Sequence, residues 1–443
     1  MESKAVSLLS RLISIPTVNP PGEKYQEFVE FAEKYFKSLG LDAEVVEVPK
    51  SEVAKHCPEC VEYPRLILLA RLGEPKIHFN GHYDVVPPGP LESWKVTRPF
   101  EPVYREGRLY GRGAVDMKGG LTSIMLAVEK AVAAGLKNFE VSFVPDEETG
   151  GETGAGYLAR SGKVKAPWVV IAEGSGEDNI WIGHRGLVWF LVEVYGKQAH
   201  GSTPWLGLNA FEGAAYIAHK LQEYVKAIST RVSKYEFDDP RGASPTVTMG
   251  GEVRGSVKTN VVPGYFAFSV DRRVIPEEDV EQVRREFVEF VEKVAKEVPH
   301  KVEVKVTNVS EAALVEPSHP LVEALSSAAE AVVGRRPRRT VCIGGLDARF
   351  FIKAGIPTVT YGPGPIGLAH APDEYVAEED GLYRRLGRPL LHKGRDPHGH
   401  LRAWAHRACP RPRRIRRGEA SDKRGRGLLQ PNKEGQQLAL RRR

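Results

Sequence analysis

The stretch that decides the fold is Ile77-His78-Phe79-Asn80-Gly81-His82-Tyr83-Asp84-Val85-Val86-Pro87, a short apolar run that ends in a turn. Its pattern predicts a buried strand with His82 and Asp84 just past its end. A His-x-Asp pair in this position suits a metal site, because one imidazole nitrogen can bind an ion while a nearby carboxylate fixes the orientation of the ring. A purely structural hydrogen bond is the alternative, and the rest of the chain must decide between them.

Length and composition indicate a soluble protein of two domains. The chain has 443 residues, of which 41% are hydrophobic and 27% charged, and it exceeds the usual size of a single domain. The N-terminus lacks a basic region followed by an apolar core, and no apolar run approaches the roughly 20 residues that span a bilayer. We therefore expect a cytoplasmic protein with no membrane partner.

Strands alternate with helices through the first part of the chain. This order predicts an α/β fold with a mostly parallel sheet covered on both faces. The expected strands are 66–72, 77–80, 140–144 and 168–172, and the main intervening helix is 121–134.

The pattern changes near residue 184. From there the order is β-α-β-β-α-β, which is typical of a ferredoxin-like unit, and the α/β pattern then resumes. We predict an α/β domain in two parts, interrupted by an inserted α+β domain. The expected boundaries are 1–183 and 308–380 for the α/β domain, 184–307 for the inserted domain and 381–443 for a basic tail.

Imidazoles and carboxylates gather where the strands of the predicted sheet end. Each one follows a strand directly or opens the loop after it, and this edge is where open parallel sheets bind ligands. So many carboxylates repel one another unless cations neutralise them. Two divalent ions about 3.5–4 Å apart, sharing one carboxylate, would do so. Zn²⁺, Co²⁺ or Mn²⁺ would suit the donors, which are His82, Asp116, the Asp146-Glu147-Glu148 run, Glu173 and His370.

Four motifs, in this order, resemble those of the dinuclear zinc hydrolases that include acetylornithine deacetylase, succinyl-diaminopimelate desuccinylase, aminoacylase and glutamate carboxypeptidase. The resemblance runs from about residue 15 to residue 380 and implies a catalytic domain with an inserted, dimerising lid. The motifs are Gly81-His82-Tyr83-Asp84-Val85-Val86-Pro87, Gly111-Arg112-Gly113-Ala114-Val115-Asp116-Met117-Lys118-Gly119, Asp146-Glu147-Glu148-Thr149-Gly150 and His370-Ala371-Pro372-Asp373-Glu374.

The resemblance also implies a role for each of these residues. Two Zn²⁺ ions are expected, with Co²⁺ or Mn²⁺ possible, and a cis peptide is common after the bridging aspartate. Glu147 would be the general base that takes a proton from water and passes it to the leaving amine. Asp116 would bridge the ions, His82 and Glu173 would complete one ligand set, Glu148 and His370 the other, and Asp84 would orient His82.

The same resemblance implies further site residues in the lid and in the last α/β segment. His200 would donate a hydrogen bond to the oxyanion, often from the partner subunit, so a homodimer is expected; a turn histidine is the alternative. Leu346 stands where a Thr or Ser is usual, which removes a hydroxyl contact. The candidates for holding the substrate carboxylate are Asn260, Arg272, Gly345 and Arg349.

Cys57-Pro58-Glu59-Cys60 is a single CxxC segment. A structural zinc site normally needs four protein ligands, and the chain has no second pair of this kind. We expect a local disulfide or two free thiols.

The basic tail differs from the rest of the chain. Residues 381–443 contain 19 Lys and Arg against 4 Asp and Glu, a net charge of +15, so the total of +6 leaves −9 for the first 380 residues. Such a segment could bind nucleic acid electrostatically, but it has no recognisable nucleic-acid-binding motif. We favour a frameshift near residue 381, because an expected closing helix is replaced there by a sequence without hydrophobic period, and we expect the tail to be disordered.

The expected function is metal-dependent hydrolysis of the amide bond of an N-acyl amino acid, of the deacetylase or desuccinylase type. A dinuclear carboxypeptidase or dipeptidase acting on short peptides is the alternative, since it would share the metal set. A non-enzymatic relative should have lost Glu147 or a ligand, and this chain retains all of them.

Overall fold

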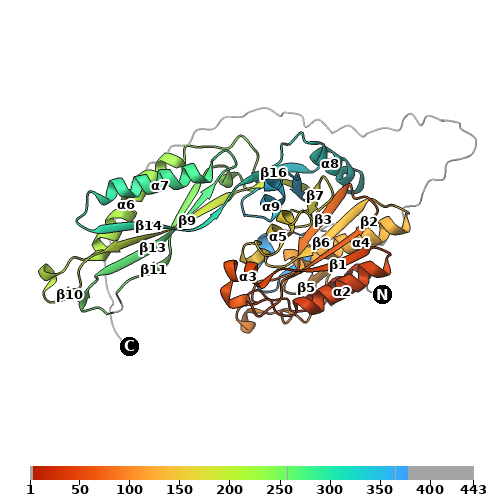
Figure 1. Cartoon of the computed structure of the whole chain (residues 1–443), viewed down its shortest axis with the longest axis horizontal. Coiled ribbons are helices and arrows are strands. Elements are labelled where there is room, and N and C mark those ends of the chain that lie inside the picture. The colour runs from red at the N-terminus through yellow and green to blue at the C-terminus, as the bar shows by residue number, and fades with distance from the viewer. Residues whose placement is uncertain (1–2, 257, 365, 378–443) are drawn as a thin grey trace, which may run out of the picture. The chain divides into compact units, whose positions relative to one another are not determined.

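A computed structural model describes residues 3–256, 258–364 and 366–377, and its largest sheet has nine strands (Figure 1). Eight of them follow one another across the sheet, and the ninth, β16, pairs with β8. In spatial order they are β1 (Asp42–Glu47), β2 (Leu66–Leu72), β6 (Phe139–Val144), β3 (Ile77–His82), β7 (Val169–Ile171), β17 (Thr358–Thr360), β8 (Asn179–His184) and β15 (Ala313–Leu314), with β16 at Arg338–Cys342.

The centre of this sheet is parallel, as the sequence predicts. β6, β3, β7 and β17 run in one direction, whereas β1, β2 and β8 are antiparallel to a neighbour. Both faces are covered: Val169 and Ile171 of β7 belong to one hydrophobic core, and Val170 between them belongs to another. A strand buried on both faces must be apolar throughout, which explains its continuous hydrophobic run.

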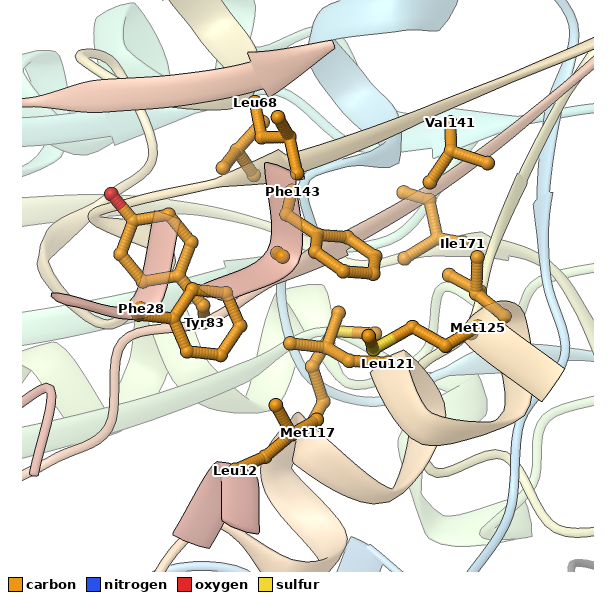
Figure 2. Packing of buried hydrophobic residues seen from close by; sticks show 14 of the residues in the cluster. Leu12, Phe28, Leu68, Tyr83, Met117, Leu121, Met125, Val141, Phe143 and Ile171 are labelled. Carbon is orange, nitrogen blue, oxygen red and sulfur yellow. The ribbon is translucent and has the colours of Figure 1, made fainter. Parts of the chain in front are cut away.

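The larger core lies between the sheet and the helices α1 (Lys4–Ile13), α2 (Tyr25–Ser38) and α4 (Gly119–Ala133) (Figure 2). Phe28 of α2 stacks on Tyr83 with ring centroids 4.7 Å apart. Gly81 of β3 is needed here, because a Cβ atom at this position would lie 2.5 Å from Leu121 and 2.7 Å from Met117. The missing side chain lets the segment around Met117 pack directly on β3.

Shorter elements complete this part of the chain. The second core includes Leu321 and Val322 of α8 with Val359 of β17. The remaining helices are α3 (Lys50–His56), α5 (Ala155–Arg160), α8 (Pro320–Val333) and α9 (Ala348–Lys353), and a small three-stranded sheet contains β4 (Val103–Arg105), β5 (Arg108–Tyr110) and β18 (Tyr375–Ala377).

A separate four-stranded sheet has the order β11-β13-β9-β14 and is antiparallel throughout. Two helices pack on it around their own hydrophobic core (Figure 1). The chain order β9-α6-β11-β13-α7-β14 is that of a ferredoxin-like unit, as predicted. The bounds are β9 (Gly186–Tyr195), α6 (Ala210–Ile228), β11 (Thr246–Arg254), β13 (Tyr265–Val274), α7 (Val280–Ala295) and β14 (Lys301–Ser310), and a two-stranded ribbon joins β10 (Ala199–His200) to β12 (Val261–Val262).

This α/β class with a ferredoxin-like insertion confirms the predicted fold. The domain boundaries and the dimerising role of the insertion, which we call the lid, stay predictions. Cys57 and Cys60 form a disulfide with an S–S distance of 1.98 Å. Within the described residues, every helix is too short or too polar to cross a membrane. The predicted basic tail, 381–443, lies outside the described residues.

Candidate metal centre

The candidate site lies at the carboxyl ends of three adjacent parallel strands. His82 is the last residue of β3, Glu147 and Glu148 lie in a short helix after β6, and Glu173 follows β7. The strand order β6-β3-β7 puts these side chains next to one another, which is the usual ligand-binding edge of such a sheet.

Asp116 lies between two imidazoles. Its Oδ1 is 2.9 Å from Nε2 of His82, and its Oδ2 is 3.1 Å from Nε2 of His370. Asp116 belongs to the short helix η3 (Ala114–Lys118), which Gly81 allows to pack against β3, and the Asp116–Met117 peptide is cis, as the resemblance implies. One carboxylate thus faces both histidines with separate oxygens.

Two groups of donors result, and they share this aspartate. In the first group, Nε2 of His82 lies 3.5 Å from Oε2 of Glu173. In the second, Nε2 of His370 lies 3.1 Å from both oxygens of Glu148. Within each group the donor atoms lie within 4.8 Å of one another. The groups are His82, Asp116 and Glu173, and Asp116, Glu148 and His370.

These residues fit a pair of divalent cations. Oε1 of the buried Glu173 has no hydrogen-bond partner in the described residues, although buried carboxylate oxygens normally have one. A cation between His82 and Glu173 would supply that partner. Two imidazoles and three carboxylates form a donor set that suits Zn²⁺ and similar ions.

The site binds protons that a cation would displace. Burial raises the pKa of Glu173 to about 8 and that of Glu148 to about 7, and the Asp116 carboxylate adds to both shifts. Hydrogen bonds to Asp116 and Glu148 raise the pKa of His370 to about 10. Because ligands must give up these protons, ion binding should release protons and strengthen as the pH rises.

Asp84 joins the first histidine to the loop that follows β6. Its Oδ1 lies 3.3 Å from Nδ1 of His82, whose other nitrogen faces Asp116. The same carboxylate accepts hydrogen bonds from the backbone N–H groups of Glu147 and Glu148, both at 3.2 Å. Asp84 is therefore in contact with both the imidazole of His82, whose Nδ1 also lies 3.1 Å from the Asp84 carbonyl, and the backbone of the Glu147-Glu148 pair.

Glu147 lies beside the metal groups, and the pKa of its carboxyl is raised. Burial, helped by the carboxylates of Asp347 and Glu148, raises its pKa well above the usual range. Asp347 is itself buried, and burial raises its pKa to about 6. A carboxylate with a raised pKa can hold a proton taken from water at neutral pH.

A buried network under this loop was not predicted as part of the site. The Asp146 carboxylate accepts hydrogen bonds from Tyr25 (3.0 Å), from Arg65 (2.8 Å) and from Asn19 (3.0 Å). The Asn19 amide also donates to Asp84 at 3.0 Å. These partners come from distant segments: Tyr25 begins α2, Arg65 precedes β2, and the segment around Asn19 has the sequence of an ordinary turn. The only hint in the sequence is Asp146 itself. It is a third carboxylate directly before the Glu147-Glu148 pair, and a buried carboxylate needs hydrogen-bond donors.

His200 and Asn260 lie together in the lid. The ribbon of β10 and β12 places them side by side, and the N–H of Gly201 donates to the carbonyl of Asn260 at 2.8 Å. Both residues are exposed. Nδ1 of His200 lies 2.7 Å from the Ser202 hydroxyl, which leaves Nε2 as the outward donor.

Arg272 is placed differently from the prediction. Its side chain is completely buried in the lid, where it lies 2.6 Å from Glu278 and donates to the Tyr224 hydroxyl. Residues alternate between the faces of β13, so Arg272 joins the buried face and Arg273 the other. The guanidinium of Arg272 is not presented to a ligand, and we do not retain it as a substrate contact.

The other two substrate candidates lie in the loop before α9 and at its start. Gly345 is exposed, and no atom lies within 4 Å of the position of a Cβ. The Arg349 guanidinium donates to the carbonyls of Leu346 at 2.7 Å and Gly150 at 2.8 Å. Arg349 thus ties this loop to the end of the Glu147-Glu148 segment.

Comparison with known families shows the class of protein. The model of the peptidase family M20/M25/M40 matches residues 78–385, well over half of the chain. The chain belongs to this family and is a metallohydrolase, which confirms the predicted relationship to the dinuclear metal hydrolases.

Individual relatives are similar to this chain along most of their own length. A metallohydrolase of Methanocaldococcus jannaschii, named as uncharacterized, is 26% identical over 85% of this chain and 96% of its own length. A succinyl-diaminopimelate desuccinylase of Nautilia profundicola is 28% identical over 85% of this chain and 95% of its own length. The structure of an M20 family metallo-carboxypeptidase of Sulfolobus solfataricus is similar in fold, with a TM-score of 0.67 at 20% identity, covering 86% of this chain and 97% of that chain.

Proposed function

We propose that this metallohydrolase cleaves the amide bond of an N-acyl amino acid, in the manner of a deacetylase or desuccinylase. The observation that carries the proposal is the position of Asp116, with one oxygen toward each histidine and Glu147 beside the two donor groups. His82, Asp116 and Glu173 would hold one divalent cation, and Asp116, Glu148 and His370 the other. Zn²⁺ is the proposed ion, with Co²⁺ or Mn²⁺ as alternatives.

Different residues of the chain would have different roles in the reaction. When bound, the cations lower the pKa of water and polarise the carbonyl group of the scissile amide. The Glu147 carboxylate takes the proton of the attacking water and gives it to the leaving nitrogen. Asp84 keeps the imidazole of His82 and the Glu147 backbone in position.

The lid and the loop before α9 supply the proposed substrate contacts. His200 would stabilise the oxyanion through its outward nitrogen, from the partner subunit of a homodimer. Asn260, Gly345 and Arg349 would contact the substrate, and the open space beside Gly345 supports its inclusion. The homodimer and a cytoplasmic location remain predictions.

An N-acyl amino acid is preferred over a short peptide because of the relatives. The desuccinylase of N. profundicola matches almost along its full length, whereas the carboxypeptidase of S. solfataricus, at 20% identity, supports the fold alone. A carboxypeptidase or dipeptidase activity remains the alternative, and it would use the same cations and the same base.

The test is release of free amine by the full-length protein loaded with Zn²⁺ or Co²⁺. The panel contains N-acetylornithine, N-succinyl-diaminopimelate, other N-acyl amino acids and dipeptides. We expect one N-acyl amino acid to exceed the others in kcat/KM and Glu147→Gln to abolish its turnover. Preference for dipeptides would replace this proposal by the alternative, and retained activity in Glu147→Gln would exclude the proposed base.

A further inference from the structure

A buried ion pair connects two loops of the candidate metal centre. Nη1 of Arg112 lies 2.7 Å from Oε2 of Glu374, and both side chains are almost completely buried. Neither residue is a donor in the two metal groups. The remaining hydrogen bonds of the two side chains within the described residues, however, go to the backbone of segments that bear the proposed ligands.

Glu374 holds the loop that bears Asp116. Its Oε1 accepts from the N–H groups of Val115 at 2.7 Å and Asp116 at 3.1 Å, and its Oε2 accepts from Gly113 at 3.2 Å. Three backbone donors within four residues, ending at the proposed bridging aspartate, thus depend on one carboxylate. The Asp116 backbone cannot move away from Glu374 without leaving buried groups unpaired.

Arg112 holds the loop that bears His370. Its Nη2 donates to the carbonyl of His370 at 3.1 Å, and its Nη1 donates to the carbonyl of Ala371 at 3.3 Å. The guanidinium also lies over the Trp94 ring, 5.1 Å from its centroid. Each side chain therefore grips the loop of one ligand, and the ion pair joins the two loops.

The two donors that belong only to the other metal group are supported in another way. His82 ends β3 and Glu173 follows β7, and these neighbouring strands are fixed by the backbone ladder of the sheet. Asp116 and His370, in contrast, come from a short helix and from a turn where His370 has a φ of 64°. Without a strand to hold them, their spacing depends on side chains.

We propose that Arg112 and Glu374 are positioning residues that set the spacing of Asp116 and His370, and so control binding of the cation held by Asp116, Glu148 and His370. This inference rests on the proposed metal sites. Breaking the ion pair should weaken binding of the cation held by Asp116, Glu148 and His370 far more than binding of the other cation. A pair that merely stabilises the fold would lower stability and leave both ions bound.

The variants are Arg112→Lys and Glu374→Gln. Lysine keeps the charge but loses the planar fork that reaches Glu374 and two carbonyls together. Glutamine keeps the shape but turns an amide donor toward Arg112 or toward a backbone N–H. The matched control is Glu140→Gln, the same change in another buried carboxylate, which accepts from the N–H groups of Lys165 and Ala166, both at 2.8 Å, far along β6 from the site.

The first measurement is calorimetric titration of the metal-free proteins with Zn²⁺. We expect two ions in the parent protein and in Glu140→Gln. In both test variants we expect affinity for one ion to fall about tenfold or more, the usual effect of losing a group that orients a ligand, while the other ion is retained. Folded variants that bind both ions like the parent, or lose both equally, would overturn the inference.

The second measurement is backbone hydrogen exchange of the metal-free proteins, which does not depend on the proposed function. Each variant should speed exchange in both loops, residues 113–116 and residues 366–371, because the altered side chain holds one loop directly and reaches the other through the pair. Faster exchange only in the loop that the altered side chain holds directly, 366–371 for Arg112→Lys or 113–116 for Glu374→Gln, would refute the coupling, even if the parent bound no metal. Absence of metal binding in the parent would refute the proposed function instead.

Discussion

The metal centre and the lid each contain a cluster of buried charges, and the balance of charge differs between them. In the lid, the buried Arg272 and the half-exposed Arg231 face Glu278, and Arg231 also pairs with Glu286. At the sheet edge, the carboxylates of Asp84, Asp116, Glu147, Glu148 and Glu173 face two imidazoles.

The difference separates a structural cluster from a functional one. Opposite charges in the lid are matched, so the cluster satisfies itself and has no need of a ligand. The sheet edge has an excess of carboxylates: the pKa values of Glu147, Glu148 and Glu173 are raised, and Oε1 of Glu173 has no hydrogen-bond partner in the described residues. Burial of charge alone does not indicate a site; an uncompensated charge does.

Removal of the proposed cations should have the largest effect, and this effect should originate at the sheet edge and leave the lid cluster unchanged. Treatment with a chelator is expected to abolish turnover and to lower the melting temperature, because the carboxylates lose their counter-charge. Addition of Zn²⁺ or Co²⁺ should restore both. Turnover that persists in protein shown by elemental analysis to be free of metal would contradict the site.

Glu147→Gln should separate chemistry from metal binding. Loss of the general base is expected to lower kcat about 10²–10⁴-fold, with both ions still bound. Its neighbour provides the control: Glu148→Gln should lose an ion. Steady-state kinetics together with metal analysis of the two variants checks this, and equal metal loss in both would contradict the division of roles.

Arg272→Met should affect the lid and leave the metal centre intact. Removing one partner of a buried pair leaves Glu278 poorly compensated and should lower the free energy of unfolding by about 4 kcal/mol. Urea unfolding measures the loss. KM and metal content should stay those of the parent, whereas a large rise in KM in the folded variant would restore Arg272 as a substrate contact.

His184, at the end of β8, offers the smallest test, in a buried group that is neither paired nor ligating. Burial lowers its pKa to about 4, so the unfolded chain binds the proton more readily. Stability should fall by at most about 3 kcal/mol as the pH drops from about 6.5 to about 4. Urea unfolding at several pH values should show a weaker decline in His184→Gln, and identical curves would contradict a depressed pKa.

Much of this arrangement could be predicted from the sequence. The parallel centre of the sheet follows from continuous apolar strands between helices, and it places the residues after those strands at one edge. That is why His82, Glu148 and Glu173, though far apart in the chain, were expected to lie together. Asp116 and His370 were expected at the same edge, and the structure brings them there although neither follows one of these strands directly.

The supporting residues could not be predicted in the same way. Asn19 and Arg65 reach Asp146 from loops that no periodic pattern places, and only the tertiary fold brings them together. Arg272 is a different case, because the sequence contains the signal. Phe268, Val270 and Val274 alternate in phase with it along β13, which indicates the buried face.

The position of His370 has a consequence for the order in which the protein is made. During synthesis from the N-terminus, His82, Asp116 and Glu173 are all present once residue 173 has emerged, so one ligand group can assemble early. The other group waits for His370, after the whole lid sequence has been translated. A nascent chain therefore contains every donor of the first proposed group before the second group can be complete.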